Sequence, residues 1–287
     1  MIRYIIITPA RDEEAYLEKT IESVLQQTIQ PQYWVIVNDG SGDRTGEIID
    51  RYAAKHPWII ARHRSNRGFR EAGGGVIVTF YDGYAQVPAG EWDFLVKLDA
   101  DLSFASDYFE QCFAEFERDP LLGIGGGGIY HEEDGELKLE HNPKFHVRGA
   151  TKIYRRECWD ELGGLLKAPG WDTVDELKAN MLGWSTRTFA ELRLWHYRFT
   201  GAADGAWKDW VKNGKANYIT GYHPLFMLMK CARKVVKRPY VLASAGLGWG
   251  FISGYWRRIP QVQDRNLIRY TRNQQMRKML MLESIWK

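Results

Sequence analysis

Two aspartates close an apolar run in the segment "FLVKLDADLSF", residues 94–104. Asp99 and Asp101 are separated by one residue, so in an extended chain both side chains point to the same face. Neighbouring carboxylates repel each other unless a proton, a cationic side chain or a metal ion lies between them. Their oxygens suit hard divalent ions such as Mg²⁺ and Mn²⁺. A metal site is therefore one hypothesis for the pair, but spacing alone favours a solvated turn after a strand, because Asp is a common turn residue.

Two further polar segments, "TPARDEE" at 8–14 and "NDGSGDRT" at 38–45, each follow a short apolar run. Arg11, Arg67 and Arg70 could contact phosphate groups, because a guanidinium group forms paired hydrogen bonds with phosphate oxygens. The alternatives are a capped turn at 38–45 and arginines that only solvate the surface.

Runs with strand character alternate with segments of helical periodicity along the first hundred residues. The predicted strands are 4–8, 33–39, 58–64 and 92–101, and the predicted helices are 14–28, 44–57 and 69–84. This alternation predicts an α/β fold with a mostly parallel central sheet and helices on both faces. Ligands of such sheets bind at the carboxyl ends of the strands. We therefore expect residues 8–14, 38–45 and 98–101 to lie on one rim.

Residues 146–182 are predicted to contain a strand, a short helix that ends at Gly163 and Gly164, and a second helix. Asp172 stands at the start of that second helix, where it could cap the helix or act in catalysis. The segment "GIGGGG" at 123–128 lacks the lysine and hydroxyl residue of a P-loop. We interpret it as a strand or a site of close backbone packing.

The length of 287 residues and the 45% hydrophobic content suit a folded globular protein. Cys112, Cys158 and Cys231 are widely spaced and odd in number, which favours reduced thiols in the cytosol. The apolar run after Met1 is too short for a secretion signal, so no export is expected.

Positive charge is concentrated towards the carboxyl terminus. Residues 223–287 contain 13 Lys and Arg but only 2 Asp and Glu, although the formal net charge of the chain is +3. Residues 239–256 carry no charged side chain, and these 18 positions are at the lower limit for crossing a bilayer core of about 30 Å. Four glycines argue against a single lipid-exposed span.

We expect residues 239–256 to belong to an interfacial or re-entrant helical pair on an anionic membrane surface. A buried core helix with basic ends is the alternative. Nucleic acid is not an expected partner, because the basic residues flank an apolar stretch instead of following a polar groove. The predicted domains are 1–221, the α/β domain, and 222–287, a helical and basic membrane-associating region.

Five segments, "ITPARDEEAYLEKTIESVLQQT", "VNDGSGDRT", "NRGFREAGG", "KLDADLSF" and "GWDTVDELKANMLGW", occur in an order that resembles family 2 glycosyltransferases of the GT-A fold, over about residues 1–200. The resemblance implies a nucleotide-sugar-binding α/β sandwich that transfers a sugar to an acceptor hydroxyl with inversion. Uridine diphosphate is the nucleotide expected from family habit. The signature Q-x-x-R-W of processive synthases is absent, so we expect one sugar to be added each time an acceptor binds, and no polymer to be made.

The resemblance also implies roles for individual residues. Asp101 would be the direct ligand of Mn²⁺ or Mg²⁺, and Asp99 would contact the ribose or a metal-bound water. His196 would complete the metal shell or be structural. The implied nucleotide-sugar-binding residues are Pro9, Ala10, Arg11, Glu13, Asp39, Arg70 and Asp99.

Relatives carry a general base as the aspartate of a Glu-Asp pair before the last helix of the sandwich. Trp171 and Asp172 fill that place here, so the glutamate is missing. Asp172 is the expected base, with Asp175 and Glu176 as alternatives.

The basic, aromatic carboxyl-terminal region favours a lipid-linked saccharide acceptor, as in the assembly of cell-surface polysaccharides. The expected location is cytoplasmic, peripheral or monotopic on the inner face of the cell membrane. Two other functions stay open. A nucleotidyltransferase would need a glycine-rich loop that "TPARDEE" does not provide. A non-catalytic nucleotide-sugar or lipid-binding module would explain the glutamate missing before Asp172.

Overall fold

The computed structural model describes residues 2–68, 74–133, 136–140, 142–198, 205–235 and 241–286. Its strands form one sheet in the order β3-β2-β1-β4-β8-β6-β9-β5, and β7 pairs with β6 beside this path. The strands are β1 (Tyr4–Ala10), β2 (Tyr33–Asn38), β3 (Ile59–His63), β4 (Phe94–Leu98), β5 (Leu102–Phe104), β6 (Leu122–Glu133), β7 (Glu136–Leu139), β8 (Thr151–Arg155) and β9 (Ser185–His196).

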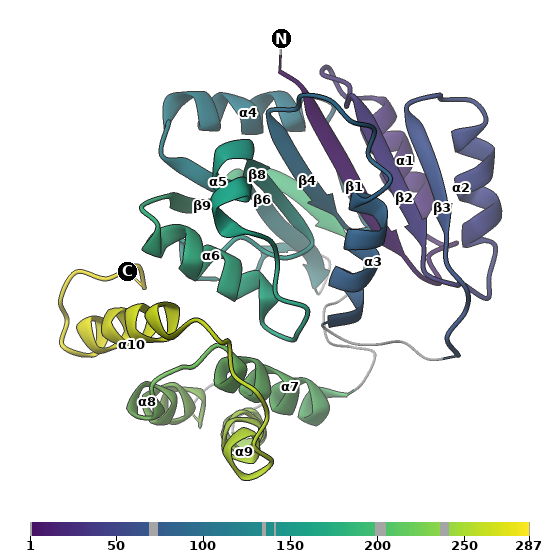
Figure 1. Cartoon of the computed structure of the whole chain (residues 1–287). Coiled ribbons are helices and arrows are strands. Elements are labelled where there is room, and N and C mark those ends of the chain that lie inside the picture. The colour runs from purple at the N-terminus through teal and green to yellow at the C-terminus, as the bar shows by residue number, and fades with distance from the viewer. Residues whose placement is uncertain are drawn as a thin grey trace.

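The helices flank the sheet and then continue beyond it (Figure 1). They are α1 (Leu17–Leu25), α2 (Thr45–Ala53), α3 (Gly74–Tyr84), α4 (Tyr108–Arg118), α5 (Arg156–Leu162), α6 (Trp171–Met181), α7 (Ala206–Ile219), α8 (Pro224–Val235), α9 (Val241–Trp256) and α10 (Arg265–Met279). The α/β fold and the predicted alternation of strands and helices at the amino terminus are confirmed.

The sheet is mixed: the prediction of a mostly parallel sheet holds for β3, β2, β1 and β4, whereas the other half combines one parallel pair, β6 and β9, with antiparallel pairs. β3, β2, β1 and β4 run parallel, as strand–helix–strand units require. β8 instead pairs antiparallel with both β4 and β6. The reason is that the chain returns from the β6–β7 hairpin and adds β8 in the opposite direction.

Side chains of β1 alternate between two cores, because successive residues of a strand point to opposite faces. Tyr4 and Ile6 face a core closed by α1, α2 and α4. Ile5 and Ile7 face a second core closed by α3, α5 and α6. Helices therefore cover both faces of the sheet, as predicted. The "GIGGGG" segment lies in β6, where a Cβ on Gly127 would lie 2.2 Å from the Leu192 carbonyl oxygen, so the expected close packing is also confirmed.

The helices α7 to α10 share a third core with α6, at the end of the sheet where α6 lies (Figure 1). α7 belongs to this packed unit although it precedes residue 222, and the division at 221 and 222 stays a prediction. None of the helices in the described ranges combines the length and the apolar character needed to cross a membrane. The three cysteines are free.

α9 covers most of the apolar stretch 239–256, whose first two residues lie outside the described residues. One face packs against α7 through glycine: a Cβ on Gly250 would lie 2.1 Å from the Val211 carbonyl oxygen, and a Cβ on Gly214 would lie 2.1 Å from that of Leu247. Only glycine allows the two backbones to approach this closely. The other face exposes Leu242, Trp249, Ile252, Tyr255 and Trp256.

Candidate active site

The segments that follow β1 and β2 are joined at one rim of the sheet. Pro9 and Ala10 end β1, and the Asp39 backbone N–H donates to the Ala10 carbonyl oxygen at 2.8 Å. The Asp12 N–H donates to Ser41 Oγ at 3.0 Å, and Asp12 Oδ1 accepts from the Gly42 N–H at 2.9 Å. β4 lies on the other side of β1, so the predicted common rim of 8–14, 38–45 and 98–101 is confirmed.

Asp39 is buried at this rim and is held by three arginines. Arg64 Nη1 donates to Asp39 Oδ1 at 2.7 Å, and Arg67 Nη2 donates to Oδ2 at 2.6 Å. Arg11 Nη1 donates to the Asp39 carbonyl oxygen at 2.9 Å. Positive charge therefore surrounds the carboxylate expected to read a base. Arg70, expected near the base or the diphosphate, lies outside the described residues.

Asp99 follows β4 directly and forms an ion pair with the buried Lys97, two positions earlier on the same face. The Lys97 ammonium also donates to the Gly149 carbonyl oxygen. Burial raises the pKa of Asp99, Lys97 opposes this rise, and the charge of Asp101 adds to it. The two carboxylates therefore do repel each other, as their spacing predicts.

Asp101 is buried and lies between two basic side chains from the end of the long strand β9. Arg198 Nε donates to Asp101 Oδ2 at 3.0 Å, and His196 Nε2 lies 3.3 Å from Oδ1. The register explains the second contact, because His196 pairs with Leu102, the neighbour of Asp101. Arg198 also forms an ion pair with the buried Glu13 and so links the segments after β1 and β4. Burial lowers the pKa of His196, but its hydrogen bond to Asp101 and the negative charges of Asp101 and Asp99 together outweigh this, and the net pKa is raised.

The donor types at this rim suit a hard divalent ion, because Asp99 and Asp101 both supply carboxylate oxygens and their charges interact. A cation beside both would relieve the repulsion that contributes to the raised pKa of Asp99. In the part of the chain that is described, however, no three His, Cys, Asp or Glu side chains are gathered into a ready metal site. Arg198 and His196 supply the positive charge beside Asp101 instead.

Asp172 lies in the first turn of α6, close to the Asp99 end of the rim. Gly170 precedes the helix with a φ of 90°, which only glycine adopts readily. A Cβ on Gly149 would lie 3.3 Å from Asp172 Cβ, and the Gly149 carbonyl is the group that Lys97 contacts beside Asp99. Burial opposes ionisation of Asp172, but the charges of His146, Lys152 and Arg148 prevail and lower its pKa.

Asp175 and Glu176 are fully buried and bind β8 and its flanking segment to α6. Lys152 Nζ lies 2.8 Å from Asp175 Oδ1 and 2.8 Å from Glu176 Oε1. Tyr154 Oη donates to Asp175 at 2.6 Å, and His146 Nδ1 lies 2.8 Å from Glu176. Burial raises the pKa of Asp175 to about 6. Of the three carboxylates considered as a base, only Asp172 is partly exposed.

Sequence reasoning missed Lys97, Arg64 and Arg198, which neutralise the acids of this rim. A signal for Lys97 was present, because a lysine inside the apolar run "FLVKL" shares a face with Asp99. No spacing could have linked Arg198 to Asp101, since 97 positions separate them and only the pairing of β5 with β9 brings them together.

Comparison with known proteins agrees with this geometry. The model of the family described as "Glycosyl transferase family 2" matches residues 5–165. "Uncharacterized glycosyltransferase EpsJ" of Bacillus subtilis is 30% identical over 176 residues, which cover 54% of this chain and 48% of that protein. "Poly-beta-1,6-N-acetyl-D-glucosamine synthase" of Staphylococcus aureus is 29% identical over 116 residues, or 40% of this chain and 26% of that protein. The matches thus span about half or less of these relatives.

Two solved structures share the fold. S. aureus TarS 1-349 has a TM-score of 0.56 and 13% identity, covering 89% of this chain and 72% of that chain. The mannosyltransferase PcManGT from Pyrobaculum calidifontis, solved with GDP-Man and Mn²⁺, has a TM-score of 0.56 and 17% identity, covering 88% and 73%. These likenesses support the GT-A-like α/β fold.

Proposed function

Because the chain belongs to glycosyl transferase family 2, we propose that it transfers a sugar from a nucleoside diphosphate sugar to an acceptor hydroxyl with inversion. The observation that carries this proposal is the rim. Acids from the segments after three neighbouring strands lie there, each paired with arginine: Asp39 with Arg64 and Arg67, and Glu13 and Asp101 both with Arg198. Family membership supports sugar transfer as the reaction, and the rim is the place in the fold where this reaction would occur.

The donor would bind across this rim. Pro9, Ala10, Arg11 and Glu13 would cradle the base and ribose, and Asp39 would read the base. We propose a UDP-sugar as donor. The fold neighbours include TarS with UDP-GlcNAc and PcManGT with GDP-Man, so the choice of nucleotide needs its own test.

Asp101 and Asp99, with His196, would hold Mn²⁺ or Mg²⁺, which would supply positive charge where the departing nucleoside diphosphate becomes more negative. Before the donor arrives, Arg198 and His196 neutralise Asp101. We propose that they release this carboxylate when the ion and the diphosphate bind.

Asp172 would be the general base. Its lowered pKa keeps it ionised near neutral pH, so it can accept the proton of the acceptor hydroxyl. The hydroxyl oxygen then forms the new bond to the anomeric carbon as the bond to the nucleotide breaks. The proton ends on Asp172, and the electron pair leaves with the nucleoside diphosphate. Asp175 and Glu176 would keep α6 in place, since both are buried in ion pairs with Lys152.

We propose further that the helices α7–α10 bring the protein to the inner face of the cell membrane, where a lipid-linked saccharide would be the acceptor. Exposed apolar side chains gather on α8 and α9, including Leu228 at 69% and Trp256 at 75% exposure. Arg257 and Arg258 follow α9 at the surface and could face anionic headgroups. An exposed apolar face with basic neighbours is typical of proteins that lie on a membrane.

A panel of nucleoside diphosphate sugars tests the function. The purified chain is mixed with each sugar and Mn²⁺, and thermal stabilisation and release of nucleoside diphosphate are followed. We expect a UDP-sugar to stabilise the protein in a metal-dependent way and to be hydrolysed slowly without acceptor. Binding without turnover, even when lipid-linked saccharide acceptors are supplied, would favour the non-catalytic module. Failure to bind any nucleotide sugar would contradict the proposal.

A further inference from the structure

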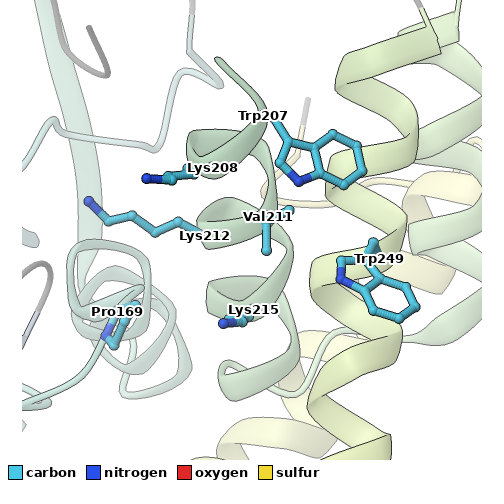
Figure 2. Close-up of a pocket in the computed structure, with 7 residues that line it drawn as sticks. All are labelled: Pro169, Trp207, Lys208, Val211, Lys212, Lys215 and Trp249. Atoms are coloured by element: carbon cyan, nitrogen blue, oxygen red, sulfur yellow. The ribbon is translucent and has the colours of Figure 1, made fainter. Parts of the chain in front are cut away.

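A groove of about 350 Å³ lies between α7, α9 and the segment that precedes α6. Its lining residues are Pro169, Trp207, Lys208, Val211, Lys212, Lys215 and Trp249 (Figure 2). Five of them come from α7 at positions spaced by about one helical turn, so they form one stripe along that helix. The lining surface is almost wholly apolar, and one of its two tryptophans, Trp249, belongs to the neighbouring helix α9.

Positive charge borders the groove, although the lysines line it mainly with their aliphatic stems. Lys208, Lys212 and Lys215 lie on the same face of α7, at spacings at which like charges repel. Among the described residues, none of the three is paired with an acid, and no acidic side chain lines the groove. Figure 2 shows Lys208 and Lys212 pointing towards the side where Pro169 lies. An anion in the groove would relieve this repulsion, and the tryptophans would suit an apolar chain attached to it.

The position of the groove connects it with the proposed base. Pro169 stands three residues before Asp172. The next residue, Gly170, packs against α7: a Cβ there would lie 3.1 Å from Thr220 Oγ1 and 3.3 Å from Ala216 Cβ. Thus the lysines lie on an exposed stripe of α7. The residues at the carboxyl-terminal end of the same helix pack against the segment that begins α6. Trp249 lines the groove and also belongs to the exposed apolar face of α9.

We propose that this groove binds the diphosphate and the first apolar units of the lipid carrier of the acceptor. The lysines would hold the diphosphate, Trp207 and Trp249 would contact the chain, and the saccharide would extend past Pro169 towards Asp172. This proposal rests on the proposed transferase function, because an acceptor has to reach Asp172 only if the chain transfers a sugar.

Geranylgeranyl diphosphate, an isoprenyl diphosphate without a sugar, is the probe. Its dissociation constant is measured by calorimetry for the full chain and for two matched double variants. Lys208→Gln/Lys212→Gln removes two exposed charges four residues apart on α7, and Arg265→Gln/Arg269→Gln does the same on α10. We expect at least about tenfold weaker binding for the α7 pair, because charged hydrogen bonds to phosphate are lost. The α10 pair should bind as the wild type does. Lys208→Arg/Lys212→Arg should restore binding.

UDP binding, measured on the same samples, separates this proposal from the proposed function. Unchanged UDP binding in the α7 variant, together with weaker binding of the isoprenyl diphosphate, supports the groove. Equal losses in both variants would mean general attraction to a basic surface and would overturn the proposal. The proposal would also be overturned if the α7 variant bound the isoprenyl diphosphate as tightly as the wild type does, or if the wild type did not bind it. If UDP does not bind the wild type, the transferase proposal is contradicted independently of any result with the isoprenyl diphosphate.

Discussion

At the scale of single residues, the rim and the start of α6 differ in how their carboxylates are neutralised. Asp39 and Asp101 are paired with arginines that a ligand could displace or share. Asp175 and Glu176 are paired with Lys152 in a fully buried cluster. Removing one member of such a cluster leaves an unpaired buried charge, which is strongly destabilising. The arginine pairs at the rim suit ligand binding, and the buried cluster around Lys152 suits a structural role.

Asp172→Asn is the most informative change at the proposed base. The amide cannot accept the proton, so we expect kcat to fall by about 10²- to 10⁴-fold. UDP affinity should stay unchanged, because none of the proposed donor contacts involves this side chain. Initial rates with a saturating acceptor and calorimetry with UDP measure the two quantities.

The pH profile of the wild type is the control for this assignment. The lowered pKa of Asp172 means that the base stays ionised as the pH falls from 8 to 5, so it imposes no loss of rate there. A base at Asp175, with a pKa of about 6, would impose a loss as the pH falls through 6. His146→Gln and His196→Gln profiles identify any contribution from these imidazoles. Unchanged turnover in Asp172→Asn would place the base elsewhere.

At the scale of elements, local patterns were sufficient where neighbours in sequence are neighbours in space. The strands and helices of the first hundred residues followed from periodicity, and so did the rim, because parallel strands place their carboxyl ends together. The mixed half of the sheet did not follow, since β8 is inserted between β4 and β6 by long-range pairing. The packing of α7 against α9 also depends on contacts that no short window contains.

The glycines of α9 give a prediction at this scale. Gly250→Ala should destabilise the helical unit by roughly 1–3 kcal/mol, because the new Cβ would overlap the Val211 carbonyl oxygen at the contact with α7. Gly248→Ala is the matched control, since its Cβ would only meet Cys231 Sγ at 3.7 Å. That change should be neutral or stabilise by about 0.5–1 kcal/mol, as for a helical glycine replaced by alanine. Urea denaturation measures both. Equal effects would show that α7 and α9 do not pack closely.

At the scale of the whole molecule, a polar rim of the sheet and an exposed apolar face of the helices lie in different parts of one chain. The sequence indicated this division through its charge asymmetry and its uncharged stretch. It could not show which face of α9 would be buried, because that depends on the helix that packs against the glycines.

Flotation with anionic liposomes tests the membrane proposal. We expect the full chain to float, and Ile252→Ser/Trp256→Ser to float much less, because two exposed apolar side chains at 61% and 75% exposure lose their transfer into the interface. Leu121→Ser/Leu182→Ser removes exposed apolar side chains outside α7–α10 and is the control. A wild-type chain that stays at the bottom of the gradient would refute membrane association.

The central claim is that the rim holds a nucleotide together with a divalent ion. Calorimetric titration of UDP into wild type and Asp101→Asn, with and without Mn²⁺, tests it most directly. We expect Mn²⁺ to strengthen UDP binding to the wild type and to have little effect on the variant, because a carboxylate that would bind the metal is lost. Equal strengthening by Mn²⁺ in both proteins, or no UDP binding in either, would contradict the account.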